Sequence, residues 1–209
     1  MTAEVATTLS GGSSIKAMTY GENCLYFVQE SNYTYYIYRI DLLTYQVTNM
    51  GSIEAWTGVD ALAYDADNDL LYAAGGFYIF QYDMKNWKTG EHNSYSNYIM
   101  DSDYCTMTGL AVIDGALYGV GNDYYSSEPT MMRYSDKYLS DRTIVAQGFD
   151  ASLVAGATDF TYDPASDLFY LTDAGHTIYT MDRDGNIETV DILGDGIDIN
   201  GFAIVPPVE

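Results

Sequence analysis

Short runs of apolar residues recur along the chain at steps of about 42 to 50 residues. The runs read AMTY at 17–20, ALAY at 61–64, GLAV at 109–112 and DFTY at 159–162, and a fifth, GFAI, stands at 201–204. Each is followed by a turn, a run with Leu-Tyr or Phe-Tyr, a run ending near Asp, and a last polar run. Side chains alternate in character along these runs, as strands require. Four short strands in a repeat of this length predict the blades of a β-propeller.

The spacing predicts one all-β domain over residues 1–209, with full four-stranded blades at about 15–53, 57–100, 104–149 and 154–195. Residues 1–12 resemble the last strand of a blade, and residues 198–209 supply a first strand. A closing blade is therefore expected to be split between the two termini, because bare strand edges are normally avoided. Two alternatives stay open: the ring closes within one molecule, or the chain completes it with a second chain or belongs to a longer propeller. No stretch shows sustained helical periodicity, so any helix should be a single turn.

The charge of the chain is lopsided, with 8 Lys and Arg against 30 Asp and Glu. A net charge of −22 disfavours binding to nucleic acid and to anionic membranes. It favours solubility outside the cell, with cation binding and adaptation to high salt as alternatives. The 22 tyrosines suit half-buried strand surfaces. No apolar run is long enough to span a membrane, and the first residues show no signal-peptide pattern.

The two cysteines, Cys24 and Cys105, fall in non-adjacent repeats. Strands of non-adjacent blades lie too far apart for a disulfide, whose Cα atoms must come within about 7 Å. We therefore expect two buried free thiols that act as small apolar side chains.

Two repeats carry a family resemblance. The segments ALAYD at 61–65, DLLY at 69–72 and YIFQYD at 78–83, and more fully residues 158–185, resemble the blades of bacterial extracellular β-propellers. That group includes NHL-like and YVTN-like repeats and the propeller modules of Gram-positive surface proteins. The resemblance covers about residues 15–205 and implies an extracellular or cell-surface location. Repeat three departs from it, with Arg133 where the other repeats have Tyr38, Phe80 and Tyr179.

Two sets of polar residues are candidate sites. The first is a ring at the start of the inner strands, which could hold a cation, water or a small polar ligand: Lys16, Asp60, Thr108, Thr158, Asp159 and Asn200. The second gathers oxygen ligands on acidic turns, as Ca²⁺ prefers: Asp65, Asp67, Asp69, Asp195, Asp198 and Asn200. The alternative is that these are ordinary turns of a very acidic surface. The DRDGN segment at 182–186 lacks the Glu of an EF-hand loop and predicts a hairpin turn instead.

A third candidate set is aromatic and consists of Trp56, Trp87, Tyr124 and Tyr125, the last two in a long loop at 121–129. Flat rings of this kind suit sugars and protein partners. The only histidines, His92 and His176, have no neighbouring metal or nucleophile partner, so we expect no enzyme.

The sequence thus predicts a non-enzymatic extracellular or cell-surface module for recognition or structure. It would present a Tyr-rich acidic surface to a protein or glycan, or to copies of itself. A glycan-binding lectin-type propeller is the alternative, and a propeller hydrolase or lyase is less favoured. Because a repeated sugar site needs repeated loop residues, the dissimilar loops weigh against the lectin.

Overall fold

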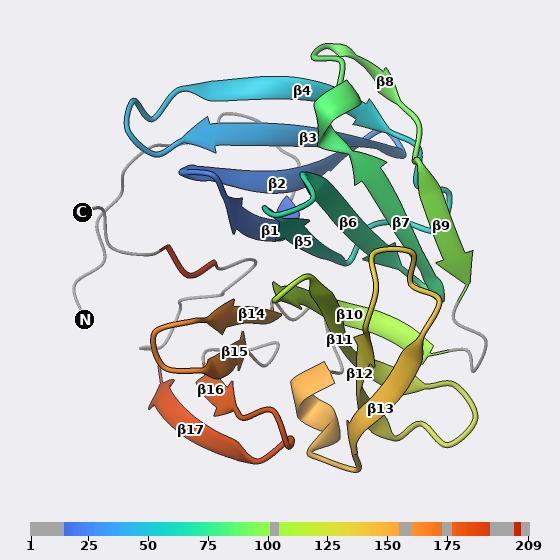
Figure 1. The fold of residues 1–209 in the computed structure, drawn as a ribbon, viewed down its shortest axis with the longest axis vertical. Helices are drawn as coiled ribbons and strands as arrows, with labels where there is room; N and C mark the ends of the chain where they lie inside the picture. The colour runs from blue at the N-terminus through green and yellow to red at the C-terminus, as the bar shows by residue number, and fades with distance from the viewer. Residues whose placement is uncertain (1–14, 101–104, 155–159, 173–176, 193–202, 206–209) are drawn as a thin grey trace.

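The computed structural model describes residues 15–100, 105–154, 160–172, 177–192 and 203–205. Its four sheets are arranged around a common centre as the blades of a four-bladed β-propeller (Figure 1). Blade 1 contains β1 (Ile15–Gly21), β2 (Cys24–Ser31), β3 (Thr34–Asp41) and β4 (Val47–Ile53). Blade 2 contains β5 (Ala61–Asp65), β6 (Leu70–Gly75), β7 (Tyr78–Asp83) and β9 (Asn97–Met100).

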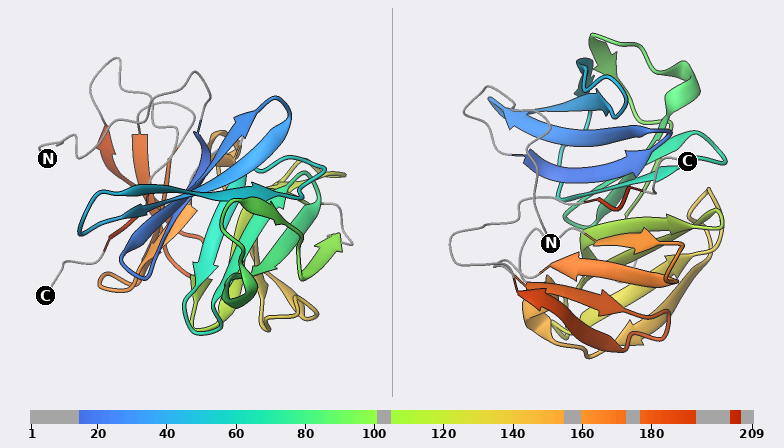
Figure 2. Two further views of the ribbon diagram at one scale, coloured as in Figure 1. Left: turned by 90° about the horizontal axis from the view of Figure 1, so that it is seen from above. Right: turned by 90° about the vertical axis from the view of Figure 1, so that its left-hand side faces the viewer.

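The other two blades follow the same order from the centre outward. Blade 3 contains β10 (Cys105–Ile113), β11 (Ala116–Asp123), β12 (Pro129–Tyr134) and β13 (Arg142–Gln147). Blade 4 contains β14 (Phe160–Asp163), β15 (Leu168–Thr172), β16 (Thr177–Met181) and β17 (Ile187–Ile192). The all-β propeller prediction is therefore confirmed, and Figure 2 shows the twist of the blades from two further directions.

The described helices are single turns, η1 (Met84–Asn86) and η2 (Ala151–Val154), as the sequence predicts. In the part of the chain that the structure describes, no helix is long and apolar enough to cross a membrane.

Alternation of side chains across each sheet builds the core between the blades. In blade 2, Phe80 and Tyr82 pack toward blade 1, whereas Ile79 between them packs toward blade 3. A third apolar cluster, with Phe160 and Phe169 stacked at 4.6 Å, joins blades 3 and 4. Burial of each large side chain contributes about 1.5 to 3 kcal/mol to the stability of the fold. The contacts between neighbouring blades therefore stabilise their arrangement.

A fifth strand in the first sheet departs from the predicted four. Strand β8 (Glu91–Asn93) leaves blade 2 and pairs in parallel with β4 of blade 1, at the upper right of Figure 1. The close approach depends on Gly51, which has a φ of +107°, because a Cβ there would lie 2.1 Å from the Glu91 carbonyl oxygen. Asn93 reinforces the pairing by donating to the Met50 carbonyl at 3.4 Å. The segment between β7 and β9 thus ties blade 2 to blade 1.

The many aspartates have a structural use at the turn after the third strand of each blade. The Oδ1 atoms of Asp41, Asp83, Asp136 and Asp182 each accept the backbone N–H two residues ahead, at 2.9 to 3.0 Å. A side-chain oxygen in this position mimics a backbone turn. Part of the acidity therefore comes from a turn device repeated in all four blades.

The predicted closing blade lies largely outside the described residues. Residues 203–205, which are described, are irregular and do not form the strand expected there. Cys24 and Cys105 are both buried free thiols, as expected. The loop predicted at 121–129 is shorter than expected, because β11 continues to Asp123 and β12 begins at Pro129.

Candidate functional site

Trp56 stands at the centre of a cluster of aromatic rings on the side of blade 2 that faces blade 1. Its ring meets four others edge-on, at centroid distances of 4.9 to 5.7 Å: Tyr78, Phe80, Tyr95 and Tyr98. Tyr78 and Phe80 come from β7, and Tyr98 lies opposite Phe80 on the outermost strand β9. Edge-to-face contacts at these distances are favourable. The rings form one packed unit, which we call the Trp56 cluster.

The Trp56 cluster is open to solvent although it is well packed. Trp56 remains 51% exposed, and Tyr98 is also exposed. Exposed Trp and Tyr rings whose positions are already fixed lose little entropy when a partner binds. Trp56 was one of the aromatic candidates, whereas the role of Tyr78 and Phe80 was missed. The signal in the sequence was Tyr98, which lies on the outermost strand of blade 2 opposite Phe80. An aromatic residue at that position could have indicated that Tyr78 and Phe80 belong to the cluster.

Tyr124 and Tyr125 form a smaller exposed pair in the turn between β11 and β12. Their rings meet edge-on at 5.5 Å, and Tyr124 also meets Phe77 of blade 2 at 5.4 Å. The Asp123 carboxylate fixes the turn by accepting the backbone N–H groups of Tyr125 and Ser126 at 2.9 and 2.7 Å. Tyr125 is 75% exposed, so this pair stays a candidate contact.

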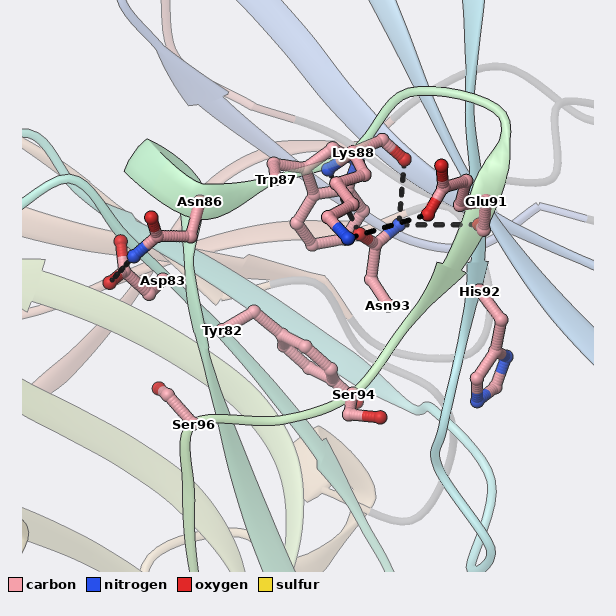
Figure 3. Close-up of a pocket in the computed structure, with 10 residues that line it drawn as sticks. All are labelled: Tyr82, Asp83, Asn86, Trp87, Lys88, Glu91, His92, Asn93, Ser94 and Ser96. Carbon is pink, nitrogen blue, oxygen red and sulfur yellow. Dashed lines mark hydrogen bonds and ion pairs between the residues drawn. The ribbon is translucent and has the colours of Figure 1, made fainter.

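Trp87, the fourth aromatic candidate, has a structural role. Its Nε1 donates to the Met50 carbonyl oxygen at 2.7 Å, and its ring packs edge-on against Tyr82 at 6.0 Å. It lines a cavity of about 350 Å³ beside β8, shown in Figure 3. In that view Asn93 points to the backbone of Lys88 and Glu91, whereas His92 points away from Trp87. Trp87 therefore anchors this segment to blade 1, and its part in contacting a partner stays a prediction.

The predicted polar ring at the start of the inner strands is only partly described. Lys16 pairs with Glu30 at 3.1 Å, and Thr108 donates to the Val120 carbonyl at 3.4 Å within its own blade. Burial raises the pKa of Asp60, although the Gly76 backbone N–H and Lys16 oppose that shift. Thr158, Asp159 and Asn200 lie outside the described residues. A site formed by the whole ring therefore stays a prediction.

A cavity of about 470 Å³ lies at the other end of the inner strands. Residues at or near the ends of β1, β5, β10 and β14 all contribute to it, so it marks the mouth of the central channel. Its lining combines three tyrosines with three carboxylates, which are Tyr20, Tyr64, Tyr162, Glu22, Asp67 and Asp114. The polar ring predicted from the sequence lies at the opposite mouth. The tyrosine that ends AMTY, ALAY and DFTY is the signal that pointed here.

The acidic turn at 65–69 does not gather its carboxylates. Asp65 accepts the backbone N–H groups of Asp67 and Asn68 at 3.1 and 3.2 Å, and Asp69 accepts the Tyr64 hydroxyl at 2.8 Å. Within the described residues, no three Asp, Glu, His or Cys side chains are placed to hold a metal ion. The geometry of Asp65, Asp67 and Asp69 therefore does not support a Ca²⁺ cluster at this turn, and the candidate site stays a prediction. Asp195, Asp198 and Asn200 lie outside the described residues.

One serine and one histidine are close enough to be a nucleophile and a base. Ser52 Oγ and His92 Nδ1 are hydrogen-bonded at 3.0 Å. They are directly opposed residues of the parallel pair β4 and β8, which explains their contact. Activating a serine also needs a third group that orients the base. No carboxylate pairs with His92 in the described part of the chain, and His176 falls outside it.

Comparison with known proteins gives the fold and no family. No family model matches the sequence, and no curated protein matches it. Among solved structures it is similar to a structural genomics protein of unknown function from Bacteroides thetaiotaomicron, with a TM-score of 0.56 and 16% identity. The match covers 84% of this chain but 43% of that one, so this chain spans less than half of its neighbour's length. A likeness at this identity supports the propeller architecture, and the NHL-like or YVTN-like resemblance stays a prediction.

Proposed function

We propose that this chain is a non-enzymatic recognition module, extracellular or on a cell surface, that binds a protein or glycan partner through the Trp56 cluster. The exposure of Trp56 among four fixed aromatic rings carries this proposal. A tryptophan whose neighbours are already ordered offers a large apolar surface at a small entropic cost. The net charge of −22 would favour neutral or basic partners over acidic ones at this site.

A single site fits this proposal better than one sugar pocket per blade. Among the described residues, the Trp56 cluster is built from the loop before β5 and from blade 2 alone. The smaller Tyr124 pair in blade 3 has different residues at a different place. A lectin with repeated shallow pockets would need the same side chains in each blade, so that alternative is less well supported.

The experiment is to screen the purified chain against immobilised glycans and against displayed peptides. The Trp56→Ala variant is screened in parallel, with the near-ultraviolet circular dichroism spectrum checking its fold. Tyr33→Ala is the matched control, because Tyr33 is 95% exposed in a turn outside the cluster. We expect a binder whose affinity falls at least about ten-fold in Trp56→Ala, as for a hot-spot aromatic residue, and stays unchanged in Tyr33→Ala. No binder in either screen, or a binder indifferent to Trp56, would overturn the proposal.

A further inference from the structure

A polar groove lies on the opposite side of blade 2, between that blade and blade 3. Its volume is about 480 Å³. Blade 2 contributes Asn68, Gln81, Lys85 and Asn97, and the turn after β12 in blade 3 contributes Lys137 and Tyr138. Because side chains alternate along β7, Gln81 faces this groove while Phe80 faces the Trp56 cluster. The two sites are therefore separate surfaces of one sheet.

In the part of the chain that the structure describes, the two lysines of the groove form no ion pair, although the chain is rich in carboxylates. The chain has four lysines, and two of them pair with glutamates: Lys16 with Glu30 at 3.1 Å and Lys88 with Glu91 at 3.7 Å. In the described part of the chain, the other two, Lys85 and Lys137, pair with no carboxylate. Both line the same groove. With 30 acidic residues available, two unpaired ammonium groups beside one groove leave positive charge for a ligand to neutralise.

The backbone that presents each lysine is held in place. Lys85 lies in the single turn η1, which Asp83 caps by accepting the Lys85 N–H at 3.0 Å and the Asn86 side-chain amide at 2.7 Å. Asp83 is the one carboxylate in the groove, and these two contacts engage both of its oxygens.

The backbone beside Lys137 is fixed by two contacts. The Gln81 side-chain amide donates to the Lys137 carbonyl at 2.7 Å, and the buried side chain of Leu139 anchors the same turn in the core. A ligand would therefore meet preorganised backbone and would order only the lysine side chains.

We propose that this groove binds an acidic sugar, whose carboxylate or sulfate group lies between the ammonium groups of Lys85 and Lys137. Asn97 supplies an amide suited to sugar hydroxyl groups, and Asn68, whose Nδ2 donates to Asp65 at 2.8 Å, supplies its amide oxygen as an acceptor. Tyr138 is 64% exposed and supplies an aromatic ring, with the Lys137 Nζ 5.4 Å from its centroid. The volume of about 480 Å³ falls in the range of small-molecule sites. This site is independent of the proposed Trp56 contact.

In the described part of the chain, Asp83 is the one carboxylate that lines the groove, and the other negative charges of the molecule lie outside it. At physiological salt, interactions between exposed charges more than about 8 Å apart are largely screened. The two nearby ammonium groups therefore contribute most of the electrostatic energy of a bound anion. Within the groove the single opposing carboxylate is Asp83. Lowering the salt concentration would weaken the screening of the distant carboxylates, and affinity would then rise less than for a typical basic site.

The test is calorimetric titration at physiological salt with three probes. These are a galacturonic acid trimer, a sulfated heparin disaccharide and a neutral galactose trimer. We expect saturable binding of at least one acidic probe and none of the neutral trimer. The double variant Lys85→Gln/Lys137→Gln should weaken that binding at least about ten-fold, since it removes both charged hydrogen-bond donors to the anion. Which acidic probe binds separates a carboxylate from a sulfate ligand.

Lys88→Gln is the matched control, because it removes the same charge from the same segment but lines the cavity beside Trp87. It should leave the affinity unchanged, and so should Trp56→Ala. The proposal is overturned if neither acidic probe binds, if the neutral trimer binds equally well, or if Lys88→Gln weakens binding as much as the double variant. Binding of polyglutamate in preference to both sugars would also overturn it, by assigning the groove to an acidic polypeptide. A loss confined to Trp56→Ala would support the proposed function and not this site.

Discussion

The hydroxyl of Tyr64 donates a 2.8 Å hydrogen bond to the carboxylate of Asp69, five residues further along the chain. The same pair recurs in blade 4, where Tyr162 donates to Asp167 at 2.6 Å. In both turns the aspartate has a left-handed backbone, with φ of 54° and 57°, a conformation that Asp tolerates better than most residues. The pair therefore closes the turn after the inner strand in two blades and brings tyrosines to the channel mouth.

Removing the Tyr64 hydroxyl should destabilise the fold measurably. Tyr64→Phe keeps the ring that stacks on Tyr26 at 5.3 Å but takes away the donor to Asp69. We expect the free energy of unfolding to fall by about 1 to 2 kcal/mol, measured by urea unfolding. Tyr33→Phe is the control and should change nothing, because Tyr33 is almost fully exposed. Equal stability of both variants would contradict a role for this bond.

Stability should decrease as the pH falls below about 4. Hydrogen bonds within their own turns hold the pKa values of Asp41, Asp123, Asp136 and Asp182 below the usual range. The unfolded chain, with aspartate pKa values near 3.9, then binds protons that the folded chain does not. The stabilisation is complete above that value and is lost as the pH drops through the folded-state values. Urea unfolding at a series of pH values between about 3 and 7 measures it.

Asp182→Asn tests the acidic turn directly. Asparagine keeps a side-chain oxygen that can accept the Asp184 backbone N–H but does not titrate. We expect this variant to lose less stability than the unaltered chain between neutral and acidic pH. Parallel curves for the two proteins would show that this turn does not contribute to acid sensitivity.

Alkaline conditions should also unfold the protein, for the opposite reason. Burial is the main cause that raises the pKa of Tyr26 and of Tyr72 to about 12. In the unfolded chain tyrosine ionises near pH 10, so the folded state holds more protons above that pH. Stability is complete below about pH 10 and decreases as the pH rises toward 12. Tyrosinate absorbance should show a late group of tyrosines that ionises together with unfolding.

Gly51→Ala should release β8 from β4. The added Cβ would lie 2.1 Å from the Glu91 carbonyl oxygen, and the φ of +107° is unfavourable for alanine. Gly115→Ala is the matched control, since Gly115 also has a positive φ, of +73°, but no atom within 4 Å of its Cβ. The control should lose about 1 to 2 kcal/mol from backbone strain alone. Gly51→Ala should lose more, and hydrogen exchange of the β8 amides should accelerate in that variant only.

The two cysteines should react only when the protein unfolds. Cys24 and Cys105 are buried, and burial raises the pKa of Cys24, which keeps its thiol protonated. The thiolate is the reactive form. A thiol reagent should therefore label neither residue in the native protein and both in urea. Rapid labelling under native conditions would show that these strands open.

The sequence predicted the blades because their first strands place apolar residues at equivalent positions. Leu62, Leu110 and Phe160, the central apolar residues of three copies, are all buried between sheets. Tight turns such as that at Asp114 and Gly115 were predictable from residue type. Both positions have a positive φ, which Asp and Gly tolerate. Local patterns of this kind specify strands and their hairpins directly.

The parts that were missed depend on contacts between distant residues. Glu91, His92 and Asn93 have no strand pattern, yet they pair with residues 51–53, some forty positions earlier. Trp87 looked exposed because its hydrogen-bond acceptor, the Met50 carbonyl, belongs to another blade. The groove with Lys85 and Lys137 likewise needs two turns that are more than fifty residues apart in sequence.

The parallel strand β8 has a consequence for association between molecules. The outermost strand of a blade offers unpaired backbone groups to any extended chain that reaches it. On β4 the positions Gly51 to Ile53 are already occupied by Glu91 to Asn93 of the same molecule. A foreign strand would have to displace this built-in partner, together with the bonds of Trp87 and Asn93 to Met50. Three residues from the segment between β7 and β9 of blade 2 thus cover part of the edge of blade 1 and disfavour edge-to-edge aggregation there.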